Sequence, residues 1–212
     1  MTPDFADIFA LFRRSAILTR PASSITSLQD LIAKAKASPG TITYSSPGVG
    51  SISQLAVELL ELRTGTKLIH VPYSGAAPAA QSVIAGTTDL GSVNVAGLIG
   101  FINSGAAKAL VQTGAERWPD LSDVPTMEQA GIPNAVVETS QMLLAPAGPP
   151  QPIIDRLAKE VLAIMHKPDV RERMLNASFA VQPEGPDQLR ARIAREVPMC
   201  KEMVERSGIK IE

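Results

Sequence analysis

The 212-residue sequence contains a single cysteine, Cys200, which excludes an internal disulfide and a cysteine-based metal cluster. Aromatic residues are also scarce, at 4%, although 45% of the residues are hydrophobic, so the core must be built from Ala, Val, Ile and Leu. Such a core, with 15 Gly and 17 Pro to form turns, is more typical of many short α/β units than of a β-sandwich. The composition therefore favours an α/β fold.

No long run of one charge or of apolar residues occurs either. The 20 basic and 21 acidic side chains are balanced and dispersed, which argues against a nucleic-acid partner and against a polybasic membrane patch. We interpret Arg13-Arg14 and the arginines of 190–195 as solvated faces. No apolar stretch has the length that a membrane-spanning helix needs.

The apolar residues near the N-terminus are too interrupted for an export signal. Residues 9–12 are followed at once by an arginine pair, and residues 15–18 by Thr19-Arg20. Neither run is long enough for the hydrophobic region of a signal peptide. We expect no signal peptide within the printed residues, and a half-buried strand in this region instead.

Strands and helices alternate regularly over residues 22–135. A helix is predicted from Ser27, which can cap the amides ahead of it, to Pro39-Gly40. The predicted strands that follow are 41–45, 67–71, 89–94 and 108–113, with helices at 51–64 and 78–85 and a short helix ending at Asn103 between them. Strands joined by helical crossovers form a parallel sheet, so we predict a compact doubly wound lobe here.

The remainder of the chain is mostly helical. After a loop at 118–126 and a short helix closed by Gly131, two strand-like pieces are predicted at 135–139 and 142–145. The predicted helices beyond them are 150–166, 168–176 and 186–207. With so few strands, we do not expect this block to form a sheet of its own.

The turn between the first two predicted strands of the lobe is the most informative segment. Ser46-Pro47-Gly48-Val49-Gly50 lies between a strand and a helix that begins at Ser51. Open α/β sheets bind ligands at such strand ends, and the free amides of a helix N-terminus attract anions. Ser53 occupies the third glycine position of a dinucleotide fingerprint, and the Walker lysine is absent, so nucleotide binding is not expected. The alternative is a turn that merely joins strand to helix.

Two later loops are predicted at the same edge of the sheet. Tyr73, followed by Gly75 and Ala76 at the start of a helix, offers an aromatic wall and a hydroxyl. Asn94 follows the next predicted strand. The alternatives are a tyrosine that packs its own loop and an asparagine that caps a helix. Convergence of these loops on one edge favours a small-molecule site.

Signatures of catalysis, metal binding and cofactors are not found. Gly50-Ser51-Ile52-Ser53 lacks the closing glycine of a nucleophile elbow. His70 and His166 are interpreted as structural residues, and Glu58 and Glu61 as exposed positions of a helix. We therefore predict a protein that binds its ligand without chemistry, and neither a cofactor nor a metal.

The order of several motifs is similar to that of a known receptor family. The motifs are Tyr44-Ser-Ser-Pro-Gly-Val-Gly-Ser51, Val71-Pro-Tyr-Ser-Gly75, Leu121-Ser-Asp-Val-Pro-Thr126 with Gly131, Ala145-Pro-Ala-Gly148 and the closing Ser207-Gly-Ile-Lys210. Together they resemble the Bug-type substrate-binding receptors of tripartite tricarboxylate transporters. The resemblance implies an α/β, periplasmic-binding-protein-like fold of type II (Venus-flytrap). It implies one complete doubly wound lobe, domain 2 at 22–135, and a partial second lobe, domain 1, from 1–21 and 136–212.

The resemblance also implies a periplasmic location, a small carboxylate ligand and membrane transporter subunits as partners. The implied ligand contacts are Ser46, Gly48, Gly50, Ser51, Tyr73, Gly75, Ala76 and Asn94. This sequence departs from the family pattern at Gln54, Ser74, Val93 and Gln141, where His, Lys, Asp and Trp are common.

The opening part of the family, with its signal peptide and glycine-rich first strand and helix, is expected to be absent. We therefore expect exposed apolar faces on the C-terminal helices, and self-association through the incomplete lobe. The alternative function is an intracellular ligand-sensing regulatory domain, because related two-lobed folds serve transcription regulators.

Overall fold

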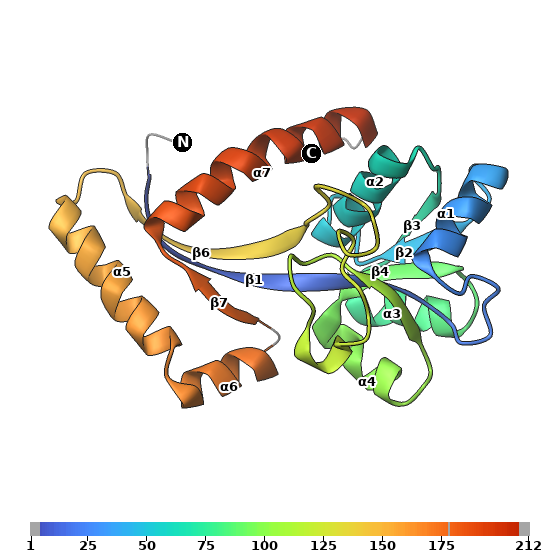
Figure 1. Cartoon of the computed structure of the whole chain (residues 1–212), viewed down its shortest axis with the longest axis horizontal. Coiled ribbons are helices and arrows are strands. Elements are labelled where there is room, and N and C mark those ends of the chain that lie inside the picture. The colour runs from blue at the N-terminus through green and yellow to red at the C-terminus, as the bar shows by residue number, and fades with distance from the viewer. Residues whose placement is uncertain (1–4, 178, 208–212) are drawn as a thin grey trace. The chain divides into compact units, whose positions relative to one another are not determined.

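The computed structural model describes residues 5–177 and 179–207 (Figure 1). These residues divide into two compact units. The larger unit comprises residues 14–138 and 203–207, and the smaller unit comprises residues 5–13, 139–177 and 179–202. The sequence-based division at 22–135 stays a prediction, and the larger unit begins several residues earlier than that division places it.

The larger unit alternates strands and helices as predicted. Its first strand is the second half of β1 (Phe5–Thr19). The elements that follow are α1 (Leu28–Ala37), β2 (Thr43–Ser46), α2 (Ile52–Thr64), β3 (Ile69–Pro72), α3 (Ala76–Ile84), β4 (Leu90–Asn94), the 3₁₀ turn Val95–Gly97, α4 (Ile99–Asn103), β5 (Lys108–Gln112) and the 3₁₀ turn Pro119–Leu121. The short helix predicted before Gly131 is a hydrogen-bonded turn instead, closed by the bond from Gly131 N to Glu128 O.

Local sequence signals account for the helix ends. Ser27 caps α1 by accepting a hydrogen bond from the Asp30 amide, and Ser51 caps α2 in the same way. Gly65 ends α2 in the left-handed conformation, at φ 66°, which glycine adopts without strain. The inward face of α2 buries Leu55, Leu59 and Leu60, whereas Leu62 is only partly buried.

The sheet of the larger unit has the strand order β3-β2-β4-β1-β5. Strand β2 is parallel to β3 and to β4, as predicted. Strand β1 lies between β4 and β5 and runs antiparallel to both, so the prediction of a wholly parallel sheet is wrong at this strand. The apolar pattern of a strand specifies its buried face but not its neighbours or its direction. Residues 15–19, assigned from sequence to the other lobe, therefore form the ladder with β4.

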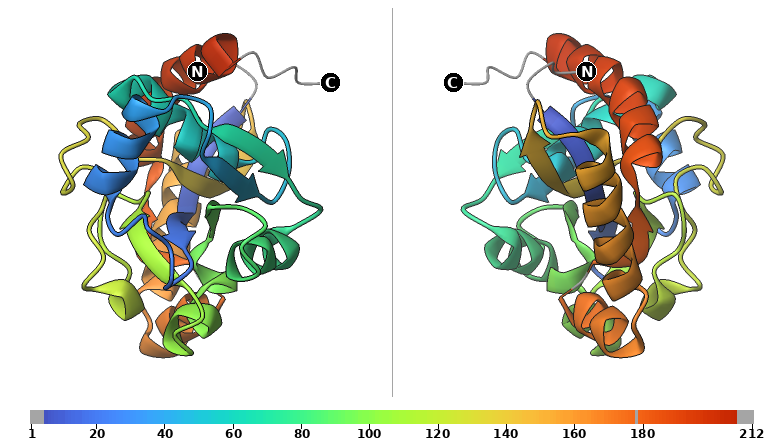
Figure 2. Two further views of the ribbon diagram at one scale, coloured as in Figure 1. Left: turned by 90° about the vertical axis from the view of Figure 1, so that its right-hand side faces the viewer. Right: turned by 90° about the vertical axis from the view of Figure 1, so that its left-hand side faces the viewer.

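Helices cover both faces of this sheet. Strand β3 lies on one side of β2 and β4 on the other, so the crossovers through α2 and α3 run in opposite directions. Right-handed crossovers then require α2 and α3 to lie on opposite faces, which Figures 1 and 2 show. The core between the layers is aliphatic, with Leu18, Leu59, Leu90 and Val93 almost fully buried. The carboxyl end of β2 is the point where the crossovers diverge.

The smaller unit consists of three strands and three helices among the described residues. Its elements beyond β1 are β6 (Glu138–Pro146), α5 (Gln151–Met165), α6 (Pro168–Asn176), β7 (Ala180–Glu184) and α7 (Pro186–Ser207), whose last residues belong to the larger unit. Strands β6 and β7 both pair with β1. The helices agree with the prediction, whereas the two predicted strand pieces are one strand and β7 was not predicted. No helix of the described residues is long and apolar enough to cross a membrane.

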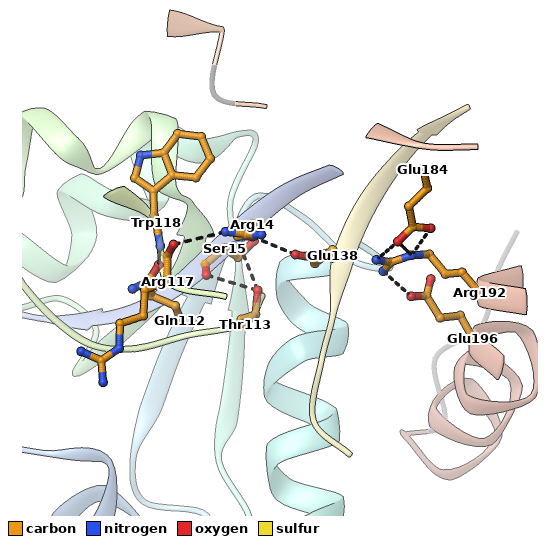
Figure 3. A network of polar contacts seen from close by, with 10 residues as sticks. All are labelled: Arg14, Ser15, Gln112, Thr113, Arg117, Trp118, Glu138, Glu184, Arg192 and Glu196. Atoms are coloured by element: carbon orange, nitrogen blue, oxygen red, sulfur yellow. Dashed lines mark hydrogen bonds and ion pairs between the residues drawn. The ribbon is translucent and has the colours of Figure 1, made fainter. Parts of the chain in front are cut away.

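Two arginines interpreted from sequence as solvated are buried. Arg192 is 8% exposed and binds the Glu184 and Glu196 carboxylates at 2.6 Å and 2.8 Å (Figure 3). Its guanidinium also lies over the ring of Phe12. Arg14 is 6% exposed and is described below. Charge alone did not distinguish these positions. The partner of Arg14 is distant in sequence. The partners of Arg192 are near it in sequence, but its burial depends on tertiary contacts such as that with Phe12.

Candidate ligand-binding site

Five strands of the larger unit bring chain segments to one edge of its sheet. Strands β2, β3 and β4 are parallel, so their carboxyl ends meet there. Strand β1 is antiparallel and therefore enters the unit at that edge, with Ser15 opposite Asn94. Strand β5 ends there too, because it is antiparallel to β1. In open α/β sheets, this edge, at the point where crossovers diverge, is where ligands bind.

The turn after β2 is held together by the Ser46 side chain. Its Oγ donates to Gly48 O at 3.0 Å and lies 2.7 Å from His70 Nε2. His70 stacks on Tyr44, with ring centroids 4.9 Å apart, and burial lowers the pKa of its imidazole. A Cβ at Gly48 would lie 3.6 Å from Tyr73 O, in a backbone conformation that disfavours other residues. Ser46 is fully buried and shapes the turn, so its hydroxyl is already engaged.

The N-terminus of α2 presents free donors at this edge. Ser51 Oγ accepts from the Gln54 amide at 3.2 Å, and Gln54 Oε1 accepts from the Gly50 amide at 2.8 Å. The two bonds resemble a capping box, except that Gln54 accepts from the residue before the N-cap, and Gln54 stands where the resemblance leads us to expect His. Among the described residues, no group accepts from the amides of Ile52 and Ser53. These amides lack an internal acceptor, and the helix dipole favours negative charge beside them.

The N-terminus of α3 offers a second set of donors. Gly75 is its N-cap, at φ 152°, and makes no side-chain cap bond. The first amide with an internal acceptor is that of Ala79, which donates to Gly75 O at 3.3 Å. The amides of Ala76 and Ala77 have no acceptor among the described residues. Helices α2 and α3 lie on opposite faces of the sheet, and both begin at the same edge.

Two serines that sequence reasoning did not select join Asn94 to α2. Ser15 Oγ donates to Asn94 Oδ1 at 3.3 Å and lies 3.1 Å from Ser53 Oγ. Ser15 and Ser53 are each 2% exposed, whereas Asn94 is half-buried. No local motif predicts this contact, because it depends on β1 pairing with a strand far along the chain.

A polar network holds Arg14, the cationic residue that precedes Ser15 in the sequence. Arg14 Nε binds Glu138 Oε1 at 2.8 Å, with both side chains buried (Figure 3). The Ser15 amide donates to Thr113 Oγ1 at 3.0 Å. The side chain of Gln112 donates to two carbonyls of the 118–126 loop and accepts from the Trp118 amide. Arg14 therefore forms a structural ion pair with Glu138 and is not a free counter-ion for a ligand.

A pocket of about 410 Å³ contains none of the predicted site residues. It is lined by Glu58, Glu61, Leu62, Thr66, Lys67, Leu68 and Met203. The pKa of Glu61 is raised to about 7, mainly by burial and in addition by the nearby Glu58 carboxylate. The amide of Leu68, which donates to the Glu61 carboxylate, acts in the opposite direction and lowers the pKa. The interpretation of these glutamates as freely exposed is therefore wrong. The strand-end edge, and not this pocket, has the convergent donors expected of an anion site.

The structure places all eight predicted contact residues at this edge. Gly50, Ser51, Gly75 and Ala76 lie at the two helix N-termini, and Ser46, Gly48, Tyr73 and Asn94 lie in the turns after the strands. Their role in binding stays a prediction.

The comparison with protein families identifies the group to which the sequence is related. Residues 2–209 match the profile of the family described as "Tripartite tricarboxylate transporter family receptor". The chain belongs to this family. Protein BugT of Bordetella pertussis is 30% identical over 196 residues, which are 92% of this chain and 60% of that protein. A protein from the tcbD-tcbE intergenic region of Pseudomonas sp. strain P51 is 31% identical over 188 residues, 88% of this chain and 56% of that protein.

Solved structures of similar proteins confirm the periplasmic-binding-protein-like α/β fold. The R. palustris protein solved with adipate is 25% identical, with a TM-score of 0.76, over 97% of this chain and 69% of that chain. MatC from Rhodopseudomonas palustris, with bound malate, is 26% identical, with a TM-score of 0.72, over 94% of this chain and 69% of that chain. The periplasmic binding protein BugD is 27% identical, with a TM-score of 0.72, over 98% and 71% of the two chains.

The family is one of receptors, which agrees with the prediction of a binding protein and not of an enzyme. It also favours the receptor over the ligand-sensing regulatory domain. The chain spans about 56% to 60% of the length of the curated relatives named above.

Proposed function

We propose that this chain is the ligand-capturing part of a solute receptor that binds a small carboxylate for a tripartite tricarboxylate transporter. The observation that carries the proposal is the convergence of unoccupied donors on one sheet edge. This set of donors consists of the amides of Ile52 and Ser53 at α2, the amides of Ala76 and Ala77 at α3, and the Asn94 side chain. Their geometry suits an acceptor group with a negative charge.

The proposed site binds its anion through neutral donors. Arg14, the cationic side chain next to Ser15, is held by Glu138. A carboxylate bound by backbone amides and an amide side chain would gain charge-assisted hydrogen bonds without a counter-ion. We therefore expect an affinity that depends little on ionic strength, because the screening of surface charges contributes little to it.

The carboxylate class is supported by the relatives. One solved relative holds adipate and another holds malate. We propose a ligand of this class, bound by the amides of Ile52, Ser53, Ala76 and Ala77 and by the Asn94 side chain. In this proposal the predicted contacts Gly48, Gly50, Ser51, Tyr73 and Gly75 line the site, and Ser46 shapes the turn. We further propose a periplasmic location and membrane transporter subunits as partners, in line with solved relatives described as periplasmic.

The experiment that tests the proposal is a calorimetric titration of the chain and its Gly50→Asp variant with adipate and malate. An aspartate at Gly50 places a carboxylate beside the free amides of α2, where it competes with the ligand and repels it. We expect at least a tenfold loss of affinity, which corresponds to about 1.4 kcal/mol.

Gly40→Asp is the matched control. Gly40 and Gly50 have φ values of 69° and 73°, and neither has a heavy atom near the position of an added Cβ. Both variants therefore introduce the same strain and the same charge, but Gly40 precedes β2 and lies at the opposite edge of the sheet. Equal affinities for the two variants, or no binding of adipate or malate by the wild-type chain, would contradict the proposal.

A further inference from the structure

A chain of three polar side chains links α2 to the end of β4. Ser53 lies in the first turn of α2, Ser15 in β1, and Asn94 is the last residue of β4. Ser15 and Asn94 are direct partners in an antiparallel ladder, so their side chains lie on the same face of the sheet. The Ser53 and Ser15 hydroxyls are 3.1 Å apart, and Ser15 Oγ is 3.3 Å from Asn94 Oδ1.

The number of hydroxyl hydrogens determines which side chain donates and which accepts in each of these hydrogen bonds. Each serine hydroxyl has one hydrogen to donate. When Ser15 donates to Asn94 Oδ1, the contact between the serines requires Ser53 to donate to Ser15. Every hydroxyl hydrogen then has an acceptor, and the last acceptor is the carbonyl oxygen of the Asn94 side-chain amide. We call this hydrogen-bonded series, from Ser53 through Ser15 to Asn94, the relay.

The opposite direction leaves a buried donor without an acceptor. If the Asn94 amide were rotated, its NH₂ would donate to Ser15, Ser15 would donate to Ser53, and Ser53 would need a further acceptor. The described residues provide none for Ser53 Oγ, which belongs to a residue that is 2% exposed. A buried donor left unpaired is strongly disfavoured, so the first direction is the stable one.

We infer that Ser15 and Ser53 are positioning residues. By holding the amide oxygen of Asn94, they leave its NH₂ group facing the ligand. An outward NH₂ group donates to carboxylate oxygens, whereas an outward oxygen would accept from ammonium or carboxamide groups. The relay therefore selects ligands that present acceptors and disfavours those that present donors. This specificity role rests on the proposed carboxylate-binding function.

The orientation of Asn94 can be measured without any ligand. In NMR spectra of the isotope-labelled 212-residue chain, the side-chain amide protons of Asn94 should lack strong Overhauser contacts to the Ser15 side chain and should exchange readily with water. Strong contacts between these protons and the Ser15 side chain would overturn the inference. This result is independent of whether the chain binds carboxylates.

The selectivity is tested by calorimetric titration with adipate and with adipamide, its uncharged diamide. We expect Ser15→Ala, which frees the Asn94 amide to rotate, to lower the ratio of adipate to adipamide affinity about tenfold. Ser15→Thr retains the hydroxyl and should restore the ratio.

The control is Ser92→Ala. Ser92 is a fully buried serine of the same strand as Asn94, and its hydroxyl has no partner among the described residues. This variant removes a buried hydroxyl without touching the relay, and its ratio should match the wild type. An unchanged ratio in Ser15→Ala, or an equal fall in Ser92→Ala, would overturn the inference. If the wild-type chain binds neither compound, the proposed function fails, while the NMR measurement still decides the orientation.

Discussion

The larger and smaller units differ in how completely they bury their apolar side chains. In the larger unit, helices cover both faces of the sheet, and Leu18, Leu59 and Leu90 are at most 1% exposed. In the smaller unit, α5 buries Ile154 but leaves Leu157 and Ile164 43% and 46% exposed. The larger unit thus has a closed aliphatic core, whereas the smaller unit has an apolar surface of the kind that usually contacts another chain segment.

The largest contrast is expected between two leucine truncations. Leu59→Ala removes a fully buried side chain of α2 and should lower the free energy of unfolding by about 2 to 5 kcal/mol through lost burial and a residual cavity. Leu157→Ala removes a half-exposed side chain of α5 and should change it by less than about 0.5 kcal/mol. Denaturant unfolding followed by circular dichroism measures both values. Similar losses would contradict the difference in burial.

A second contrast compares ion pairs of the two units. Arg14→Met breaks the buried pair with Glu138 and should destabilise the protein by about 3 kcal/mol, because a carboxylate in a dry environment loses its principal partner. Arg190→Met removes a more exposed arginine, 3.7 Å from Asp7, and should cost less than about 1 kcal/mol. The same unfolding measurements apply. A small effect of Arg14→Met would show that water reaches Glu138.

The stability of the larger unit should also depend on the protonation of Glu61. Burial raises the pKa of this carboxyl from its ordinary 4.5 to about 7, so the folded state binds the proton more tightly. The resulting stability is present below pH 4.5 and is lost as the pH rises towards 7. Glu61→Gln should remove about 1 kcal/mol of this pH dependence, allowing for solvent screening at a half-exposed site. Glu160→Gln, at an exposed site of α5, should leave the dependence unchanged in unfolding curves from pH 4 to 8.

The smallest effect on folding, but a clear effect on association, is expected from charges on α5. The exposed apolar side chains Leu157 and Ile164 of α5 are here called the apolar stripe. Leu157→Lys and Ile164→Lys place ammonium groups on this stripe and should change the free energy of unfolding by less than about 0.5 kcal/mol. We predict that the wild-type chain self-associates through this stripe and that the double variant sediments as a monomer. Glu160→Lys, outside the apolar stripe, should leave the association intact. A monomeric wild-type chain in analytical ultracentrifugation would contradict the prediction.

The features that were predictable from sequence are those written in adjacent residues. Ser27 and Ser51 mark helix starts, and Gly65 marks a helix end, because caps and left-handed glycines act within one turn. The strand-turn-helix order then places the predicted contact residues at one edge of the sheet. These steps use only local geometry and the handedness of crossovers.

The features that could not be predicted depend on distant pairing. The insertion of β1 between β4 and β5 brings Ser15 to Asn94, and neither residue carries a local signal of the other. The burial of Arg14 follows from Glu138 for the same reason. Strand β7 was not predicted because its five residues, interrupted by a proline, lack a strong alternating pattern.

The most direct test of the central claim is to map where a dicarboxylate binds. In ¹⁵N-labelled chain titrated with adipate, the account predicts the largest amide shifts at Ile52, Ser53, Ala76 and Ala77, together with the side-chain NH₂ of Asn94. Shifts concentrated around Glu58, Glu61 and Leu68, or on α5, with the strand-end edge unchanged, would contradict it.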